Sequence, residues 1–391
     1  MKRIPNDVTV QIFSGGFLRE TTTFEDVEKK LSSILPRLPV SKVIMGWSPD
    51  KALYEKTASL LVKKNIGFYL WFPVFSETGV LEKLGALVDY QSRQTDSRGE
   101  QSDEDFDFCC PNNKHNIEKI LAIFDQKYAS IPFTGVFLDK IRYPSSANAG
   151  GSGNGFRSTC TCFCPDCLAF YKKENVDVDR LKAALARPAD LPFGVSAYKG
   201  NGEYTFDDSI IYDFFQLKAR ILYKSLERIC THFREKGLGI GFDVFAPFLS
   251  AFAGQDLPAL SGLCDFIKPM MYRATNAPAG IPFEAEALLR ETGAANRAGF
   301  YRALGINSES MPFDRDFAAR DLQNFCSASA CPVYAGIEIN RKKDIADIYP
   351  DYIEETIMAF SGTGIVGFAL SWNLLDAPEE NIVKAAGIIK K

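Results

Sequence analysis

The sequence predicts an α/β fold in which eight parallel strands close into a (β/α)8 barrel. Eight short apolar runs recur along the 391 residues, and stretches with the spacing of amphipathic helices separate most of them. Apolar strands that alternate with helices indicate a parallel sheet buried on both faces. Eight such units in a chain of this length favour the closed barrel over a doubly wound open sheet. No G-x-G-x-x-G motif follows the first run, which agrees with this choice.

Turn residues bound each expected strand, and the eight strands lie at 8–13, 42–47, 67–72, 135–139, 238–243, 265–272, 333–339 and 365–372. The clearest helical stretches between them lie at 23–35, 50–64, 114–128 and 208–236. We expect one barrel domain over residues 1–391. Two irregular stretches, 91–107 and 145–204, follow strands, which places them on the barrel face that carries active sites. The second is a Cys-rich insertion after the fourth strand.

Composition excludes several classes of function. Hydrophobic residues make up 46% of the chain and charged residues 24%, which excludes a disordered or fibrous protein. The 45 basic and 49 acidic residues give a net charge of −4, so no basic excess favours nucleic acid as a partner. Only 2 histidines are present, which limits His-based catalysis and His-rich metal sites. No apolar run approaches the roughly 18 residues of a membrane span.

The first residues run into an expected strand without the apolar core of a signal peptide. We therefore expect a cytoplasmic protein, although a secreted protein whose leader has been removed would begin in the same way. The sequence predicts no particular oligomeric state.

Polar residues at the carboxyl ends of barrel strands are where chemistry is expected. The fourth strand ends at Asp139, and Pro144 soon breaks any helix that this side chain could cap. We expect a functional role for Asp139, with Arg142 paired to it and holding its pKa low. The alternative is an ion pair with a purely architectural role.

The next strands bring further charged residues to the same mouth. Asp243 lies among apolar neighbours in the fifth strand, where burial would raise its pKa toward that of a general acid. A buried structural carboxylate fits the same position equally well. The sixth strand delivers Lys268 and Tyr272, and a buried lysine needs a carboxylate partner. Glu338 ends the seventh strand.

All three tryptophans, Trp47, Trp71 and Trp372, fall at expected strand ends. Aromatic faces stack on sugar rings, and paired carboxylates supply the acid and base that cleave a glycosidic bond. We therefore expect a glycoside hydrolase with a carbohydrate substrate. Asp139 would be the nucleophile or base, and Asp243 or Glu338 the general acid. The residues expected to contact or orient the substrate are Arg142, Tyr143, Lys268, Tyr272, Trp47, Trp71, Glu77, Trp372 and Asn373.

One segment also resembles a known family. Residues 133–144 (FTGVFLDKIRYP) are similar to the "G-[hydrophobic]-x-x-D-x-x-R-Y-P" signature of glycoside-hydrolase-like (β/α)8 proteins. Weaker likeness continues through 109–113, 241–256, 265–273 and 364–373. The resemblance implies a barrel with a carbohydrate-active site and Asp139 as its first carboxylate. It implies neither a substrate nor a role, since this carboxylate is a nucleophile in some barrel glycosidases and an acid/base in others.

Four cysteines, Cys160, Cys162, Cys164 and Cys167, lie within eight residues of the insertion. Cys164-x-x-Cys167 resembles half of a zinc knuckle, and the other two thiols could complete a tetrahedral four-thiolate site. Such a closed site would be structural and would pin an insertion too polar to fold alone. Unliganded or disulfide-linked thiols are the alternative.

Three competing hypotheses remain. A non-catalytic carbohydrate-binding barrel would keep its tryptophans at the mouth, with its carboxylates locked in salt bridges to Arg142 and Lys268. A radical S-adenosylmethionine enzyme would use Cys160, Cys164 and Cys167, whose spacing matches its cluster motif. In those enzymes, however, the motif normally follows the first strand. The fold alone does not exclude a barrel enzyme of other chemistry, such as an aldolase.

Overall fold

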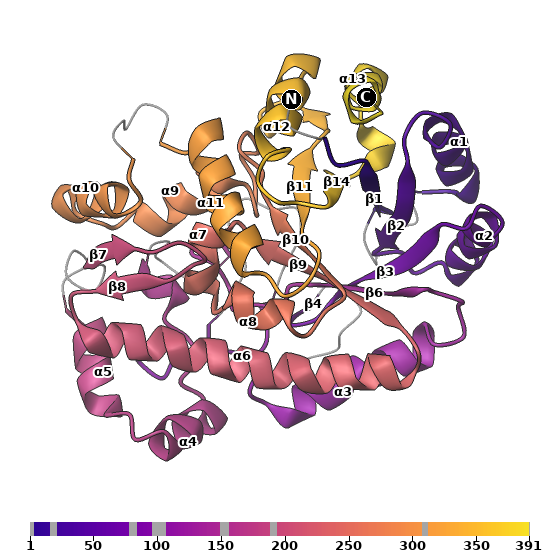
Figure 1. The fold of residues 1–391 in the computed structure, drawn as a ribbon. Helices are drawn as coiled ribbons and strands as arrows, with labels where there is room; N and C mark the ends of the chain where they lie inside the picture. Colours follow the sequence, from indigo (N-terminus) through magenta and orange to yellow (C-terminus); the bar gives the residue numbers. More distant parts are fainter. Residues whose placement is uncertain are drawn as a thin grey trace.

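In the computed structural model, eight parallel strands close into a barrel in the order β1-β14-β11-β10-β9-β6-β3-β2 (Figure 1). The structure describes residues 4–15, 22–77, 84–95, 107–148, 156–187, 194–306 and 312–390. Every barrel strand overlaps one of the eight ranges expected from the sequence, so the predicted (β/α)8 barrel is confirmed. The strands are β1 (Asp7–Phe13), β2 (Val40–Gly46), β3 (Gly67–Pro73), β6 (Gly135–Asp139), β9 (Gly239–Phe245), β10 (Phe266–Met270), β11 (Tyr334–Glu338) and β14 (Gly367–Ser371).

Helices follow the strands and cover the outside of the barrel (Figure 1). Several begin at a side chain that accepts a hydrogen bond from the first turn, as Thr23, Asp50, Asn113 and Asp208 do. The helices around the barrel are α1 (Phe24–Ile34), α2 (Lys51–Val62), α3 (Lys114–Lys127), α6 (Ser209–Glu235), α7 (Pro247–Ser250), η2 (Ala251–Ala253), α8 (Leu257–Ser261), α9 (Ile281–Leu289), α10 (Ala294–Ala303), α11 (Arg315–Ala328), α12 (Pro350–Phe360), η3 (Leu374–Asp376) and α13 (Glu379–Ile389).

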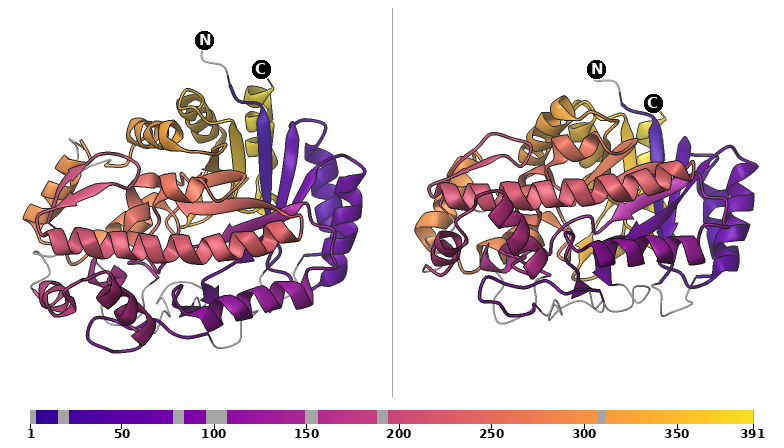
Figure 2. Two further views of the ribbon diagram at one scale, coloured as in Figure 1. Left: turned by 60° about the horizontal axis from the view of Figure 1, so that its bottom comes forward. Right: turned by 90° about the horizontal axis from the view of Figure 1, so that it is seen from below.

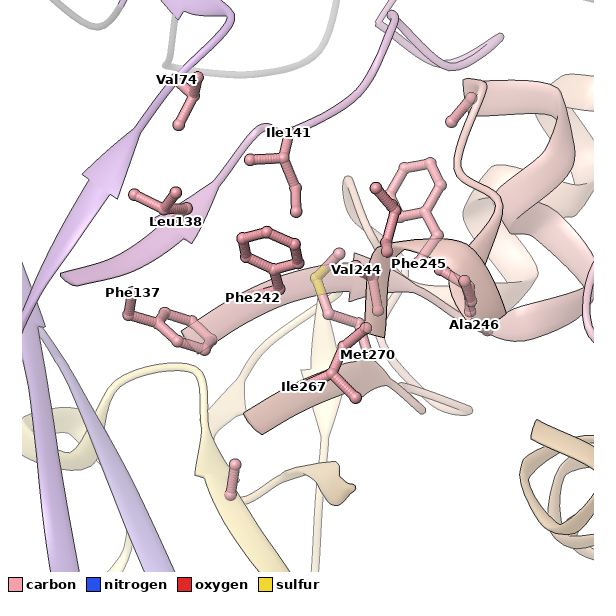
Figure 3. Close-up of a cluster of buried hydrophobic side chains, with 14 of the residues drawn as sticks. Val74, Phe137, Leu138, Ile141, Phe242, Val244, Phe245, Ala246, Ile267 and Met270 are labelled. Carbon is pink, nitrogen blue, oxygen red and sulfur yellow. The ribbon is translucent and has the colours of Figure 1, made fainter. Parts of the chain in front are cut away.

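The barrel interior is filled by side chains, so it is a core and not a pore. Aromatic rings fill part of this interior, where Phe266 contacts Tyr69, Phe137 and Tyr334. Gly241 makes room for this cluster, because a Cβ there would lie 2.2 Å from the ring of Phe266. Figure 3 shows the adjoining apolar cluster, with labelled side chains from Val74, Phe137, Leu138, Ile141, Phe242, Val244, Phe245, Ala246, Ile267 and Met270.

The insertion after β6 forms a small layer against one end of α6. It contains η1 (Phe156–Thr159), α4 (Pro165–Lys173), α5 (Val178–Leu185), β7 (Val195–Tyr198) and β8 (Tyr204–Phe206). The 27 residues of α6 span about 40 Å. This length lets one helix contact α5 and β8 of the insertion and also α3 of the barrel (Figure 2).

Short two-stranded pairs complete the description: β4 (Ser76–Glu77) with β5 (Asp107–Phe108), and β12 (Arg341–Lys342) with β13 (Ala346–Asp347). Parts of both expected polar loops, at 96–106, 149–155 and 188–193, lie outside the described residues. Among the helices that are described, none combines the length and hydrophobicity needed to cross a bilayer.

Candidate active site

Asp139 is the last residue of β6 and faces the mouth of the barrel. Its side chain is nearly buried, and each of its two oxygens accepts one hydrogen bond. The indole Nε1 of Trp71 lies 3.0 Å from Oδ2, and the backbone N–H of Lys140 lies 2.5 Å from Oδ1. The carboxylate is therefore held in one orientation, as a nucleophile or base requires.

Asp243 lies on the neighbouring strand β9 at the same height. The β6–β9 ladder runs in register up to the pair Leu138–Phe242, so the next pair in that register is Asp139 with Asp243. Adjacent strands lie about 4.8 Å apart, and residues at matching positions project to the same face. The sequence expectation that these two carboxylates meet at one mouth agrees with this register.

Lys268 on β10 pairs with Asp243, and each side chain is at most 2% exposed. Its Nζ lies 2.9 Å from both carboxylate oxygens of Asp243. It also donates to Gln11 Oε1 at 3.1 Å and to the Tyr272 hydroxyl at 2.8 Å. The three hydrogen-bond donors of the ammonium group thus all have acceptors inside the barrel. The expected carboxylate partner of Lys268 is therefore Asp243, and the Tyr272 hydroxyl contacts Lys268.

Burial raises the pKa of Asp243 to about 7. The ammonium group of Lys268 offsets only part of the desolvation, and the negative charge of Asp139 raises the pKa further. A carboxyl group with this pKa is partly protonated at neutral pH, so it can donate a proton.

Three aromatic rings lie beside Asp139 at the mouth. The ring centroids of Phe13, Trp47 and Trp71 are 5.5 to 6.3 Å apart. Trp47 and Lys140 both have positive φ, 69° and 54°, which is uncommon for residues with side chains. The ammonium group of Lys140 lies 5.2 Å from the Trp47 ring centroid, so the two unusual backbone positions meet at this site.

A pocket of about 660 Å³ opens next to this aromatic group and shares Phe13 with it. Charged side chains of both signs line the remaining wall between α1 and α13, among them Asp26, Lys29, Lys30 and Glu379.

Glu338 is fully buried at the end of β11, and both of its oxygens are occupied by the protein. Oε1 accepts hydrogen bonds from the backbone N–H groups of Ala274 and Thr275, at 2.8 and 2.9 Å, and from the Thr275 hydroxyl at 3.1 Å. Oε2 accepts from the hydroxyl of Tyr352 on α12. Glu338 therefore ties the segment after β10 to α12, an architectural role that the sequence analysis did not expect.

Arg142 lies between the rings of Phe108 and Phe245, 4.6 and 4.4 Å from their centroids. In the part of the chain that the structure describes, its guanidinium donates to Tyr143 O and to Asn148 Oδ1 and forms no ion pair with Asp139. The expected Arg142–Asp139 pair is therefore wrong. The flat guanidinium stacks between two aromatic faces, which directs its donors elsewhere.

Two further residues expected to contact substrate make contacts within the protein. Tyr143 is fully buried, and its ring packs against Lys218, whose Nζ lies 4.6 Å from the ring centroid. Asn373 uses its Oδ1 for the backbone N–H groups of Phe13 and Leu375, and its amide nitrogen for Asp376. It caps η3 and joins β1 to the segment after β14.

Trp372 follows β14 and is half-buried. Its backbone N–H donates to Asn340, and its indole nitrogen has no hydrogen-bond partner among the described residues. The side chain of Glu77, also expected at the site, lies outside what the structure describes.

Sequence reasoning missed two polar side chains of the mouth. Gln11, inside β1, accepts from both Lys268 and Ser371. The alternation of side chains along β1 predicts that Gln11 points inward, but no sequence motif marks this residue. Glu284 on α9 is 2% exposed, and burial raises its pKa. It borders a void of about 10 Å³ with Ser145. Nothing in the sequence linked it to the mouth.

Away from the mouth, four buried thiols meet: Cys110, Cys162, Cys164 and Cys167 have sulfurs within 4.8 Å of one another. The sulfur of Cys110 lies 3.5 Å from those of Cys164 and Cys167. A tetrahedral site with Zn–S bonds of about 2.3 Å would place its sulfurs roughly 3.8 Å apart. The cluster could therefore hold a metal ion.

Cys160, expected as a ligand, is not part of this group. Its sulfur approaches the carbonyl oxygen of Phe156 at 3.6 Å, and Cys110, from the segment before α3, completes the four. The correction also removes the radical-enzyme hypothesis, whose motif needs Cys160 beside Cys164 and Cys167.

Two backbone donors lie at the cluster. The N–H groups of Val88 and Cys164 each lie 3.4 Å from the sulfur of Cys162. Cys164 is the N-cap residue of α4, a position where the helix dipole favours negative charge. The donor set fits a metal with four thiolate ligands.

No protein-family model matches the sequence, and no curated protein matches it. Among solved structures, the PgaB (BpsB) glycoside hydrolase domain from Bordetella bronchiseptica is similar over 99% of both chains, with TM-score 0.58 and 13% identity. Alpha-L-fucosidase isoenzyme 2 from Paenibacillus thiaminolyticus is similar over 99% of this chain and 49% of its own, with TM-score 0.51 and 9% identity. The chain therefore has the barrel fold of these glycoside hydrolases.

Proposed function

We propose that the protein is a glycoside hydrolase that uses Asp139 and Asp243 as its carboxylate pair. The observation that carries the proposal is the placement of these two side chains at matching positions of adjacent strands, beside the aromatic group of Phe13, Trp47 and Trp71. The shared fold with glycoside hydrolases supports it. Adjacent strands lie about 4.8 Å apart, which is compatible with the roughly 5–5.5 Å between the carboxyl groups of retaining enzymes.

In the proposed mechanism, a sugar ring stacks on the indole rings with its anomeric carbon above Asp139. Asp243 donates its proton to the glycosidic oxygen as the leaving group departs, which its raised pKa favours. Asp139, oriented by Trp71 and Lys140, attacks the anomeric carbon and forms a glycosyl ester. Asp243, now ionised, accepts a proton from the water that hydrolyses this ester, while Lys268 stabilises its charge.

A screen of glycans and aryl glycosides tests the proposal, with Asp139→Asn run beside the wild type. We expect hydrolysis of one substrate class by the wild type and a loss of several orders of magnitude in rate in the variant. Asp316→Asn is the matched control, because Asp316 is 76% exposed on α11 and outside the mouth. Equal rates in wild type and Asp139→Asn would contradict the proposal.

The second candidate is a non-catalytic carbohydrate-binding barrel. The nearly complete burial of the Asp243–Lys268 pair favours it, because a locked ion pair is what that hypothesis predicts. If the barrel only binds carbohydrate, calorimetry should detect sugar binding by both the wild type and Asp139→Asn, and neither protein should cleave the sugar.

We also propose that Cys110, Cys162, Cys164 and Cys167 hold one zinc ion with a structural role. Four protein ligands leave no open position for chemistry, so the ion would join the segment before α3 to the insertion. Metal analysis of Cys110→Ser and Cys160→Ser separates the two possible ligand sets. We expect one zinc per chain in wild type and Cys160→Ser, and none in Cys110→Ser. The reverse result for the two variants would overturn the assignment.

A further inference from the structure

Two free thiols, those of Cys264 and Cys331, meet on the face of the barrel opposite the mouth. Cys264 lies just before β10 and Cys331 just before β11, at the amino-terminal ends of adjacent strands. Their sulfurs are 3.6 Å apart. A disulfide bond holds its sulfurs at about 2.05 Å, so these two need to approach by only roughly 1.5 Å. Neither thiol belongs to the candidate active site or to the four-thiol cluster.

Hydrogen bonds between the same two segments hold the thiols together from both sides. Before each cysteine, the backbone N–H of Ala330 donates to the Ser261 hydroxyl at 2.8 Å. After each cysteine, the N–H of Ile267 donates to the carbonyl oxygen of Pro332 at 3.0 Å. The fold itself therefore keeps the two sulfurs in contact, and a bond between them needs no rearrangement of the strands.

The two thiols differ in how easily a reagent can reach them. Cys264 is 6% exposed, whereas Cys331 is partly exposed. A hydrogen bond from Cys264 lowers the pKa of the Cys331 thiol, because it stabilises the thiolate. Cys331 is therefore the thiol that an external disulfide can meet first, and Cys264 is placed to displace the mixed disulfide that results.

We propose that Cys264 and Cys331 are a dithiol pair that forms a disulfide bond by exchange with a small-molecule disulfide such as oxidised glutathione. The Cys331 thiolate attacks one sulfur of glutathione disulfide, which forms a mixed disulfide and releases one glutathione thiolate. Cys264 then loses its proton, and its sulfur attacks that of Cys331 and releases the second glutathione. The protein loses two thiol hydrogens, and glutathione disulfide is reduced to two thiols. This inference is independent of the proposed hydrolase and of the proposed zinc site.

The new bond would fasten a seam of the barrel that lacks part of its ladder. Ile267 and Met271 of the β10 segment donate their N–H groups to the carbonyl oxygens of Pro332 and Gly336 beside them. Pro269, at the alternate position between these donors, has no N–H to give. A disulfide also constrains the unfolded chain, here across the long loop between the two cysteines. We therefore expect the oxidised protein to be the more stable form.

The test incubates the purified protein with oxidised glutathione, alkylates the remaining thiols and maps the disulfides by mass spectrometry. In the wild type we expect the peptides of Cys264 and Cys331 to be linked. We also expect the melting temperature to rise by about 3–8 °C and to return after reduction with dithiothreitol. Cys326→Ser is the matched control, because Cys326 is a partly exposed thiol on α11, and it should behave as the wild type does.

The single variants test the order of the two steps. Cys264→Ser should stop at the mixed disulfide and carry one glutathione on Cys331. Cys331→Ser should leave the buried Cys264 unmodified. Neither variant should show the rise in melting temperature.

The peptide map of the wild type decides the proposal even if a serine variant does not fold. Free thiols at both positions after oxidation would overturn it, and so would a disulfide that joins either cysteine to the buried Cys230 or to the four-thiol cluster. A linked pair with an unchanged melting temperature would overturn the expected fastening of the β10–β11 seam.

Discussion

Among single residues, burial acts differently on the two charged groups of the Asp243–Lys268 pair. Asp243 and Lys268 are both removed from water, yet their environments differ. Lys268 has three acceptors, whereas burial and the nearby charge of Asp139 oppose ionisation of Asp243. A buried ion pair contributes little net stability. The consequence of this pair is that the carboxyl group of Asp243 can either hold or lose a proton near neutral pH.

This assignment predicts the alkaline limb of the pH profile. A carboxyl group whose pKa is raised to about 7 is protonated below that pH and loses its proton as the pH rises through it. A general acid must hold the proton, so kcat/KM should fall about tenfold per pH unit above pH 7. The measurement is kcat/KM between pH 5 and about 9 on the substrate that the screen identifies. A flat profile across that range would exclude Asp243 as the acid.

Among the secondary-structure elements, two barrel strands end in a carboxylate whose surroundings differ. Both Asp139 and Glu338 end a barrel strand, and their sequence contexts look alike. The segment at residues 274–275 folds over Glu338 and occupies its Oε1, while the mouth above Asp139 keeps aromatic neighbours. Sequence reasoning could not separate them, because the difference comes from the path of a neighbouring segment.

Glu338→Gln tests this distinction. The variant keeps an acceptor for Ala274 and Thr275 but loses the charged acceptor for the Tyr352 hydroxyl. We expect a loss of about 1–3 kcal/mol in the free energy of unfolding and a kcat within about tenfold of the wild type. Thermal melting and a rate assay on the same preparation measure both. Unchanged stability with a rate as low as that of Asp139→Asn would place Glu338 in the catalytic pair.

For the molecule as a whole, the local sequence pattern predicted the barrel. The contacts of Cys110 and Arg142 depend on segments that are far apart in the sequence. Apolar runs and helical spacing predicted all eight strands, because a parallel sheet buried on both faces leaves a strong periodic signal. Cys110 was missed because its ligand partners lie more than fifty residues later, and only folding brings the segments together. The stacking of Arg142 between Phe108 and Phe245 likewise depends on two separate segments, so its pairing with Asp139 was wrongly expected.

In the proposed mechanism, Asp139 and Asp243 have different roles in cleaving one bond. The most direct measurement compares Asp139→Asn and Asp243→Asn on two aryl glycosides of the same sugar, one with a dinitrophenolate leaving group and one with a poor leaving group. A dinitrophenolate departs without a proton, so we expect Asp243→Asn to cleave this substrate at near wild-type initial rates and the other hardly at all. We expect Asp139→Asn to cleave neither. Equal losses of Asp243→Asn on both substrates, or wild-type rates in Asp139→Asn, would contradict the claim.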